Sequence, residues 1–184
     1  MCNFHSDTVS HIMNGCNKLK KAYQERHNRL VNIIHDKITT FNPGCEIIKD
    51  KPLRPEYFEE NLSNVHFTTR SVRPDICIID REEKTVNLVE VSVPFDAHIN
   101  QCYQTKFEKY LPLSLEINSM GYYAKVIVLI VGSLGYVHQR FPTGLQKLKF
   151  SKRESKFMAK YCSISSIIGS HRVWKMRCRD ESMN

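Results

Sequence analysis

The stretch SVRPDICIIDREEKTVNLVEVSVPF, residues 71–95, contains two β-branched apolar runs, DICIID and TVNLVEVSV, separated by the charged segment REEK. Apolar runs of this length joined by a short polar segment are typical of a β-hairpin. Side chains alternate along a strand, so Glu90 is expected on the face opposite to Val89 and Val91. The hairpin would bring Asp75, at the start of the first run, and Glu90, in the second run, onto neighbouring strands.

The segments around this hairpin predict an α/β fold. Residues 17–38 carry apolar side chains mostly at helical spacing and are followed by the stop signal NPGCE. Residues 98–120 show the same helical spacing, with a kink or a restart expected at Pro112. The continuously apolar segment AKVIVLIVGSLG predicts a strand that is covered on both faces. Residues 144–174 are expected to form one or two basic helices, whereas 46–70 indicates only a loop with short structure. This order predicts a mixed β-sheet flanked by helices.

Length and composition favour one main intracellular domain. The chain has 184 residues, of which 41% are hydrophobic, enough for one core. Its net charge of +8 favours a polyanionic partner or an anionic membrane surface, and charge alone does not choose between them. No apolar run has the length of a membrane-spanning helix and no signal peptide is visible, so we expect a soluble protein without a membrane. Seven cysteines without a framework spacing favour reduced thiols or metal ligands over disulfides.

The two carboxylates of the hairpin need a partner, because an unpaired buried carboxylate costs several kcal/mol. The next helix offers Lys106 and Lys109. Two acids and a lysine that converge on one point are what metal-dependent phosphodiester cleavage requires. The carboxylates of Asp75 and Glu90 would bind Mg²⁺ or Mn²⁺, and the lysine would orient the attacking water and offset developing negative charge.

Simpler interpretations remain open for the same residues. An aspartate after a proline often caps a turn, and a glutamate can lie on the solvated face of an edge strand. Asp75 and Glu90 could also form only ion pairs with Lys106 and Lys109, in a structural or protein-interaction domain. The spacing therefore leaves three classes of function open: a nuclease, a binding module and a structural domain.

The order of these motifs resembles a known family. The chain contains RPD, then fourteen intervening residues, an acid in LVEVSVPFD and then KFEKY. This pattern is similar to the restriction-like endonuclease domain at the C-terminus of site-specific non-LTR retrotransposon polyproteins, a branch of the PD-(D/E)xK nuclease superfamily. In the commoner form of the superfamily the catalytic lysine follows the second acid by two residues, where this chain has a serine. In the branch resembled here, the catalytic lysine lies instead on the next helix. The resemblance implies metal binding by Asp75 and Glu90. It also implies that Lys106 or Lys109 is the catalytic lysine and that Tyr110 completes the catalytic signature.

The resemblance covers most of the chain. QERHNRLVNIIHDKI is similar to the helix before the nuclease and IIGSHRVWKMR to its last helix, which implies a restriction-endonuclease-like core over residues 17–178. The polar end RDESMN is expected to be a disordered tail over 179–184. Glu25, on the first of these helices, is a further candidate metal ligand.

Residues 1–16 resemble the end of the zinc knuckle that precedes the nuclease in these polyproteins. Cys2, His11 and Cys16 match the last three ligands of its Cys, Cys, His, Cys order, and the first ligand would precede the chain. Either the chain is a fragment cut inside the knuckle, or His5 completes a Zn²⁺ set, because structural zinc takes four N or S ligands. A disordered N-terminus with scattered thiols is the remaining alternative.

The function implied is that of a metal-dependent endonuclease, part of a retrotransposon-derived protein, which nicks DNA at the integration target in the nucleus. DNA is the expected partner, with element RNA as a further candidate. The basic runs NKLKK, KLKFSKR and KMRCR would hold the DNA backbone without sequence choice. The polymerase motifs of the family are absent from these residues, so this chain is not a reverse transcriptase by itself. A catalytically inactive nucleic-acid-binding fragment is the alternative.

Overall fold

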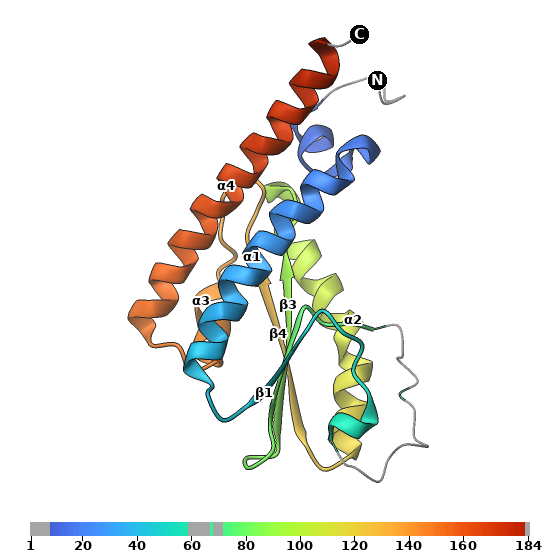
Figure 1. Ribbon diagram of the computed structural model, residues 1–184, viewed down its shortest axis with the longest axis vertical. Helices are drawn as coiled ribbons and strands as arrows, with labels where there is room; N and C mark the ends of the chain where they lie inside the picture. Colours follow the sequence, from blue (N-terminus) through green and yellow to red (C-terminus); the bar gives the residue numbers. More distant parts are fainter. Residues whose placement is uncertain (1–7, 59–66, 68–71, 183–184) are drawn as a thin grey trace.

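A computed structural model describes residues 8–58, 67 and 72–182, with side chains up to 178 (Figure 1). One four-stranded sheet has the order β1-β2-β3-β4. Its strands are β1 (Glu46–Lys49), β2 (Ile76–Asp80), β3 (Thr85–Ser92) and β4 (Tyr123–Ile130). The first three strands are antiparallel, and β4 runs parallel to β3. The α-helices are α1 (Lys20–Phe41), α2 (Ile99–Ser119), α3 (Phe141–Gln146) and α4 (Lys152–Ser182), and short helices lie at His11–Gly15, Asn17–Leu19, Pro55–Tyr57 and Asp96–His98. The prediction of a mixed sheet flanked by helices is confirmed.

The predicted hairpin is formed by β2 and β3. Ile76 pairs with Val89 and Asp80 with Thr85, so the four residues of REEK make the connection. The carboxylate of Asp80 accepts a 3.0 Å hydrogen bond from the backbone N–H of Glu83, which stabilises the turn.

The helices cover the two faces of the sheet unequally. The face that carries Val89 and Val91 packs against apolar side chains of α1, α3 and α4 in one hydrophobic cluster. The opposite face, which carries Leu88, packs against Tyr110, Leu113 and Ile117 of α2 in a second cluster. Figure 1 shows α1 and α4 on one side of the strands and α2 on the other. Glu90 therefore faces α2, as the alternation predicted.

Several elements differ from the expectation. Residues 46–49 form the edge strand β1, which the weak pattern of this segment did not reveal. Pro112 lies inside α2, which continues through it to Ser119 and is not restarted. The strand β4 is the other edge of the sheet, and only its second half, from Ile127 onward, is buried. Helix α4 runs to Ser182, into the segment predicted as a disordered tail.

The described part of the N-terminal segment packs on the rest of the molecule. Ile12, Met13 and Cys16 form a hydrophobic cluster with residues of the first helical turns and with Val173 of α4. Residues 8–16 are therefore joined to the domain by a shared core. No helix in the described ranges is long and apolar enough to cross a membrane.

Candidate active site

Asp75 and Glu90 meet at the open end of the hairpin. Ile76, the first residue of β2, pairs with Val89 of β3. Asp75 precedes Ile76 and Glu90 follows Val89, so the antiparallel pairing places the two acids opposite each other. The Oδ2 atom of Asp75 accepts a 2.7 Å hydrogen bond from the backbone N–H of Val91. The side chain of Glu90 is 5% exposed and that of Asp75 is 15% exposed. The hairpin therefore brings together a buried Glu90 and a partly buried Asp75.

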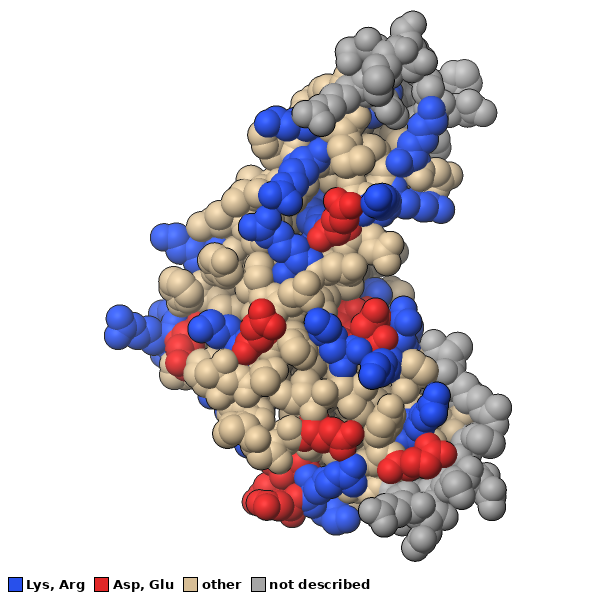
Figure 2. Space-filling view, viewed as in Figure 1, with Lys and Arg blue, Asp and Glu red and all other residues tan. Residues whose placement is uncertain are grey.

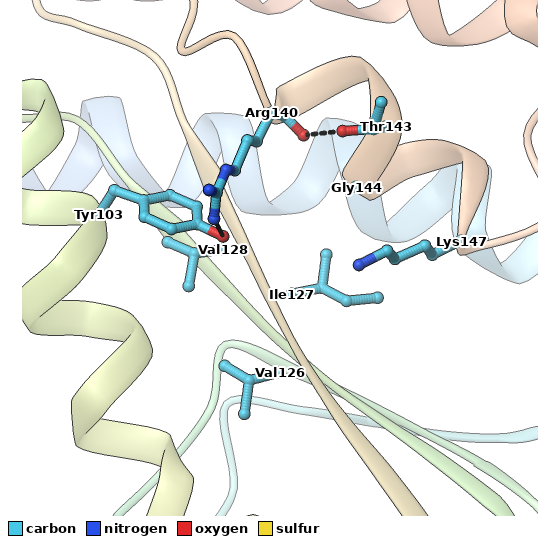
Figure 3. Close-up of a pocket in the computed structure, with 8 residues that line it drawn as sticks. All are labelled: Tyr103, Val126, Ile127, Val128, Arg140, Thr143, Gly144 and Lys147. Carbon is cyan, nitrogen blue, oxygen red and sulfur yellow. Dashed lines mark hydrogen bonds between the residues drawn. The ribbon is translucent and has the colours of Figure 1, made fainter.

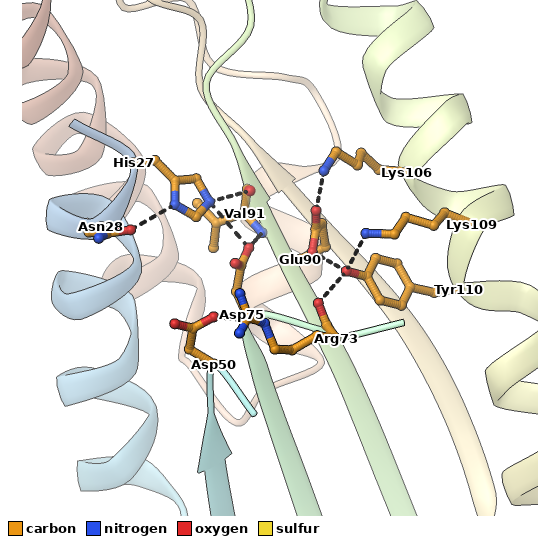
Figure 4. A network of polar contacts seen from close by, with 10 residues as sticks. All are labelled: His27, Asn28, Asp50, Arg73, Asp75, Glu90, Val91, Lys106, Lys109 and Tyr110. Carbon is orange, nitrogen blue, oxygen red and sulfur yellow. Dashed lines mark hydrogen bonds and ion pairs between the residues drawn. The ribbon is translucent and has the colours of Figure 1, made fainter. Parts of the chain in front are cut away.

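Two side chains of α2 satisfy the carboxylate of Glu90 (Figure 4). The ammonium group of Lys106 forms an ion pair with Oε1, and the hydroxyl of Tyr110 donates a 2.5 Å hydrogen bond to Oε2. Burial lowers the pKa of Lys106, but the charge and hydrogen bond of Glu90 outweigh it and raise this pKa. Burial and the charge of Glu90 together raise the pKa of Tyr110. Both groups therefore stay protonated as donors to Glu90 at neutral pH.

The two lysines of KFEKY have different partners. Lys109 donates a 3.2 Å hydrogen bond to the hydroxyl of Tyr110 and lies 4.8 Å above the centre of its ring. The same hydroxyl lies 2.8 Å from the backbone carbonyl of Arg73. Lys106 therefore contacts the candidate metal ligand directly, whereas Lys109 reaches it through Tyr110. The structure brings all five residues predicted from the motifs into one network.

A histidine that sequence reasoning missed contacts Asp75 from α1. The Nε2 atom of His27 lies 3.4 Å from Oδ2 of Asp75 and 3.0 Å from the backbone carbonyl of Val91, and Nδ1 lies 3.2 Å from the amide oxygen of Asn28. Burial lowers the pKa of His27, but Asp75, Asn28 and the Val91 carbonyl together raise it to about 9. All these neighbours accept hydrogen bonds, which fits a doubly protonated imidazolium.

Glu25 is exposed on α1, on a different face from His27. It joins none of the hydrogen bonds and ion pairs that surround the two acids among the described residues.

The sequence signal that could have revealed His27 is its helical spacing of three and four residues from the buried Leu30 and Val31, which puts it on the helix face toward the sheet.

Two hollows flank the acidic pair. One, of about 160 Å³, is lined by Asp75, His27 and Asp50 among others, on the side of α1. The other, of about 210 Å³, is lined by Lys106 and Cys102 among others, on the side of α2. Asp50 is itself paired with Arg73 at 3.1 Å. Asp75 therefore opens directly into the first hollow, whereas the buried Glu90 lines neither hollow and contacts the second through Lys106.

The donor set of Asp75 and Glu90 fits Mg²⁺ or Mn²⁺. A carboxylate offers about four lone-pair sites, and the two bonds to Glu90 leave room for a cation. On Asp75, only Oδ2 has a partner among the described residues. The described residues hold no cluster of three or more His, Cys, Asp or Glu side chains placed for a metal. Magnesium needs no such cluster, since it is usually bound by one or two carboxylates and keeps several waters.

A hollow beside α3 lies apart from these acids. It has a volume of about 250 Å³ and lies between α2, the edge of β4 and α3 (Figure 3). Arg140 lies 5.1 Å above the ring of Tyr103 and donates a 3.3 Å hydrogen bond to its hydroxyl, and Lys147 points into the same space. Among the described residues that line this pocket there is no carboxylate for Mg²⁺ to bind.

The predicted zinc ligands are described only in part. Cys2 and His5 lie outside the described residues. His11 is 8% exposed and Cys16 is 2% exposed, and both lie in the packed segment against α1. The hydroxyl of Tyr23 accepts a 3.1 Å hydrogen bond from the backbone N–H of Cys16. The zinc set stays a prediction.

Compared with known proteins, the chain matches no protein-family model, and no curated protein shows significant sequence similarity to it.

Proposed function

We propose that this protein is a Mg²⁺- or Mn²⁺-dependent endonuclease that nicks DNA, and that it belongs to a retrotransposon-derived protein acting in the nucleus. We also propose that its sheet and helices form a restriction-endonuclease-like core. The observation that carries the proposal is the convergence of Asp75, just before β2, with Glu90 of β3 and Lys106 of α2.

The chemistry of these residues supports the proposal. A divalent cation held by Asp75 and Glu90 would polarise a phosphodiester and lower the pKa of a bound water. Tyr110 and the backbone N–H of Val91 hold the two carboxylates in one orientation. Lys106 supplies a positive charge beside Glu90, where negative charge develops during hydrolysis.

His27 adds a second positive charge on the opposite side of the pair. Its contact with Asp75 comes from α1, whereas Lys106 comes from α2. Positive side chains of two helices therefore lie on either side of the acidic pair. Their charge offsets that of the two carboxylates, which favours the approach of a polyanion to the site.

A basic surface at one end of the molecule supports DNA binding. In the upper part of the face in Figure 2, over the first turns of α1 and the last turns of α4, most of the charged residues are Lys and Arg. The runs NKLKK and KMRCR, far apart in sequence, contribute exposed cations such as Lys20, Lys21 and Lys175 to this end. A set of lysines at one end can hold the DNA backbone by counterion release, without sequence choice.

The test is conversion of supercoiled plasmid to nicked circle while Mg²⁺ or Mn²⁺ is titrated into the purified chain. Glu90→Gln should lower the nicking rate by at least about 100-fold. Glu108→Gln is the matched control, because Glu108 is an exposed acid of α2 that accepts a 2.6 Å hydrogen bond from Gln104 and lies outside the network. Equal nicking by wild type and Glu90→Gln would refute the assignment.

One observation favours the second candidate, an inactive nucleic-acid-binding fragment. Lys106 and Tyr110 already satisfy both oxygens of Glu90, so the network is stable without a metal ion. That candidate requires retention of plasmid with a steep salt dependence and no metal-dependent nicked product.

A further inference from the structure

Helix α4 has its large apolar side chains on the outside. Phe157, Tyr161, Ile164 and Ile168 are 64%, 46%, 46% and 41% exposed. Their spacing of four, three and four residues puts them on one face of the helix, and we call this set the apolar stripe. Eleven residues separate its ends, so it extends over about 16 Å.

The inner face of the same helix carries several serines beside its buried apolar residues. Ser155, Ser165, Ser166 and Ser170 are all at most 4% exposed. Ser166 and Ser170 donate hydrogen bonds to the carbonyls of Gly132 and Ser133 at 2.8 Å and 2.5 Å. A helix whose only apolar neighbour is its own domain buries its large side chains, because burial of an isoleucine or phenylalanine contributes about 1.5–3 kcal/mol. Helix α4 buries Met158, Cys162 and Val173 against its own domain but leaves the apolar stripe exposed, which indicates a second partner on its outer face.

More apolar side chains extend this face sideways. The turn after β4 lies against α4, where Ser163 donates a 2.6 Å hydrogen bond to the carbonyl of Gly135. A side chain at Gly135, whose φ is +98°, would collide with Ile167. The turn also exposes Tyr136, at 60%. The exposed Ile167, next to Ile168 of the stripe in sequence, therefore connects this turn to the outer surface of α4.

The charges around the apolar stripe are positive. Helical spacing places Lys160 beside Phe157 and Ile164, Arg153 one turn before Phe157, and Arg172 one turn after Ile168. All three cations are exposed, and none has an ion-pair partner among the described residues. Glu154, the one nearby acid on α4, accepts a 2.8 Å hydrogen bond from the backbone N–H of Ser151.

These charges argue against a second copy of the chain as the occupant. An antiparallel pair of α4 helices that matches Tyr161 with Ile164 of the other copy would also bring Arg153 near Arg172. Like charges in contact oppose association. An apolar stripe between unpaired cations is instead complementary to a helix with an apolar face and acidic flanks.

We propose that the outer face of α4 is a docking site for an amphipathic helix whose flanks carry Asp or Glu. The apolar stripe supplies the anchors, as in other helix-in-groove contacts, and Lys160, Arg153 and Arg172 select acidic partners. The site does not depend on the proposed nuclease activity.

The test uses a fluorescent synthetic peptide of helical design, with leucines on one face and glutamates on both flanks, and fluorescence anisotropy with the full chain under reducing conditions. The peptide should bind saturably with a Kd on the order of 10 µM. A shuffled peptide of the same composition should bind at least about tenfold more weakly, and so should a peptide with lysines in place of the glutamates.

Matched variants separate the surface from the fold. Ile164→Ser should weaken peptide binding about tenfold, whereas Met176→Ser, which changes another exposed apolar residue of α4 outside the stripe, should leave it unchanged. Lys160→Gln should weaken binding and reduce its salt dependence, and Lys147→Gln, at an exposed lysine outside α4, should do neither.

Three results would overturn the proposal. The first is equal binding of the designed and shuffled peptides, or no effect of Ile164→Ser on binding. The second is a concentration-dependent dimer in analytical ultracentrifugation that Ile164→Ser abolishes while no peptide binds, which would assign the stripe to a second copy. The third is loss of plasmid retention in Ile164→Ser without peptide binding, which would assign it to nucleic acid.

Discussion

Removal of one hydroxyl tests whether Glu90 is held as a buried anion. Tyr110 is 1% exposed, and its hydroxyl donates to Glu90 at 2.5 Å. The variant Tyr110→Phe keeps the ring in the α2 cluster and removes this donor, together with the acceptor of the hydrogen bond from Lys109. Glu90 then retains Lys106 but loses the partner of its second oxygen.

The expected loss follows from the charge on the acceptor. A hydrogen bond to a charged group contributes about 1.5–3 kcal/mol, against about 1 kcal/mol for a neutral pair. We therefore expect Tyr110→Phe to lower the free energy of unfolding by about 2 kcal/mol, which is about a 30-fold change in the unfolding equilibrium.

Tyr122→Phe is the matched control. Tyr122 is also buried, at 4% exposed, but its hydroxyl donates a 3.1 Å hydrogen bond to the neutral carbonyl of Phe58. Its loss should cost about 1 kcal/mol or less.

The assay is urea unfolding of both variants at pH 7 with EDTA and a reducing agent. With a slope of about 2 kcal/mol/M, Tyr110→Phe should lower the midpoint by about 1 M, twice the shift of the control or more. If both variants unfold at the same urea concentration, Tyr110 does not stabilise a charged Glu90, and the account of the site given above is wrong.

Three further predictions concern other groups of the same domain. The pKa of His27 in the folded chain, about 9, exceeds its ordinary 6.5, so the stability contributed by protonated His27 is complete below pH 6.5 and is lost as the pH rises to 9. Between these pH values the free energy of unfolding of wild type, measured in urea, should fall by about 1–3 kcal/mol relative to that of His27→Gln. Parallel pH curves for the two proteins would refute the ion pair. Millimolar Mn²⁺ should raise the thermal midpoint of wild type and not that of Asp75→Asn, and an equal rise would place the metal elsewhere. Burial raises the pKa of the Cys77 thiol, so a thiol reagent at pH 8 should modify the exposed Cys178 within minutes and Cys77 only when the chain unfolds. Similar modification rates for the two cysteines would contradict the packing of β2.

The meeting of Asp75 and Glu90 could be predicted because it depends on local rules. A two-residue period and a short charged turn determine which side chains of a hairpin share a face and which lie opposite each other. The hairpin brought Asp75 and Glu90 to neighbouring strands as expected. The following helix, with its apolar spacing, similarly supplied Lys106 and Tyr110.

Other features depend on contacts between distant segments. The four residues of β1 carry too little pattern to be recognised, and they form a strand because β2 offers them a free edge. Pro112 is tolerated inside α2, where the helix packs on the sheet through Tyr110 and Leu113. A propensity that would end an isolated helix was overridden by the burial of this face.

The sequence by itself determined the periodic elements of this protein, their order and the pair of acids on the hairpin, because periodicity is a relation between near neighbours in the chain. Only the tertiary structure decided that Lys106 rather than Lys109 contacts Glu90, that His27 contacts Asp75, and that the serines of α4 face inward. Each of these choices depends on which segment lies across from a side chain. Residues 64 positions apart, such as His27 and Val91, become neighbours only when the whole core has packed.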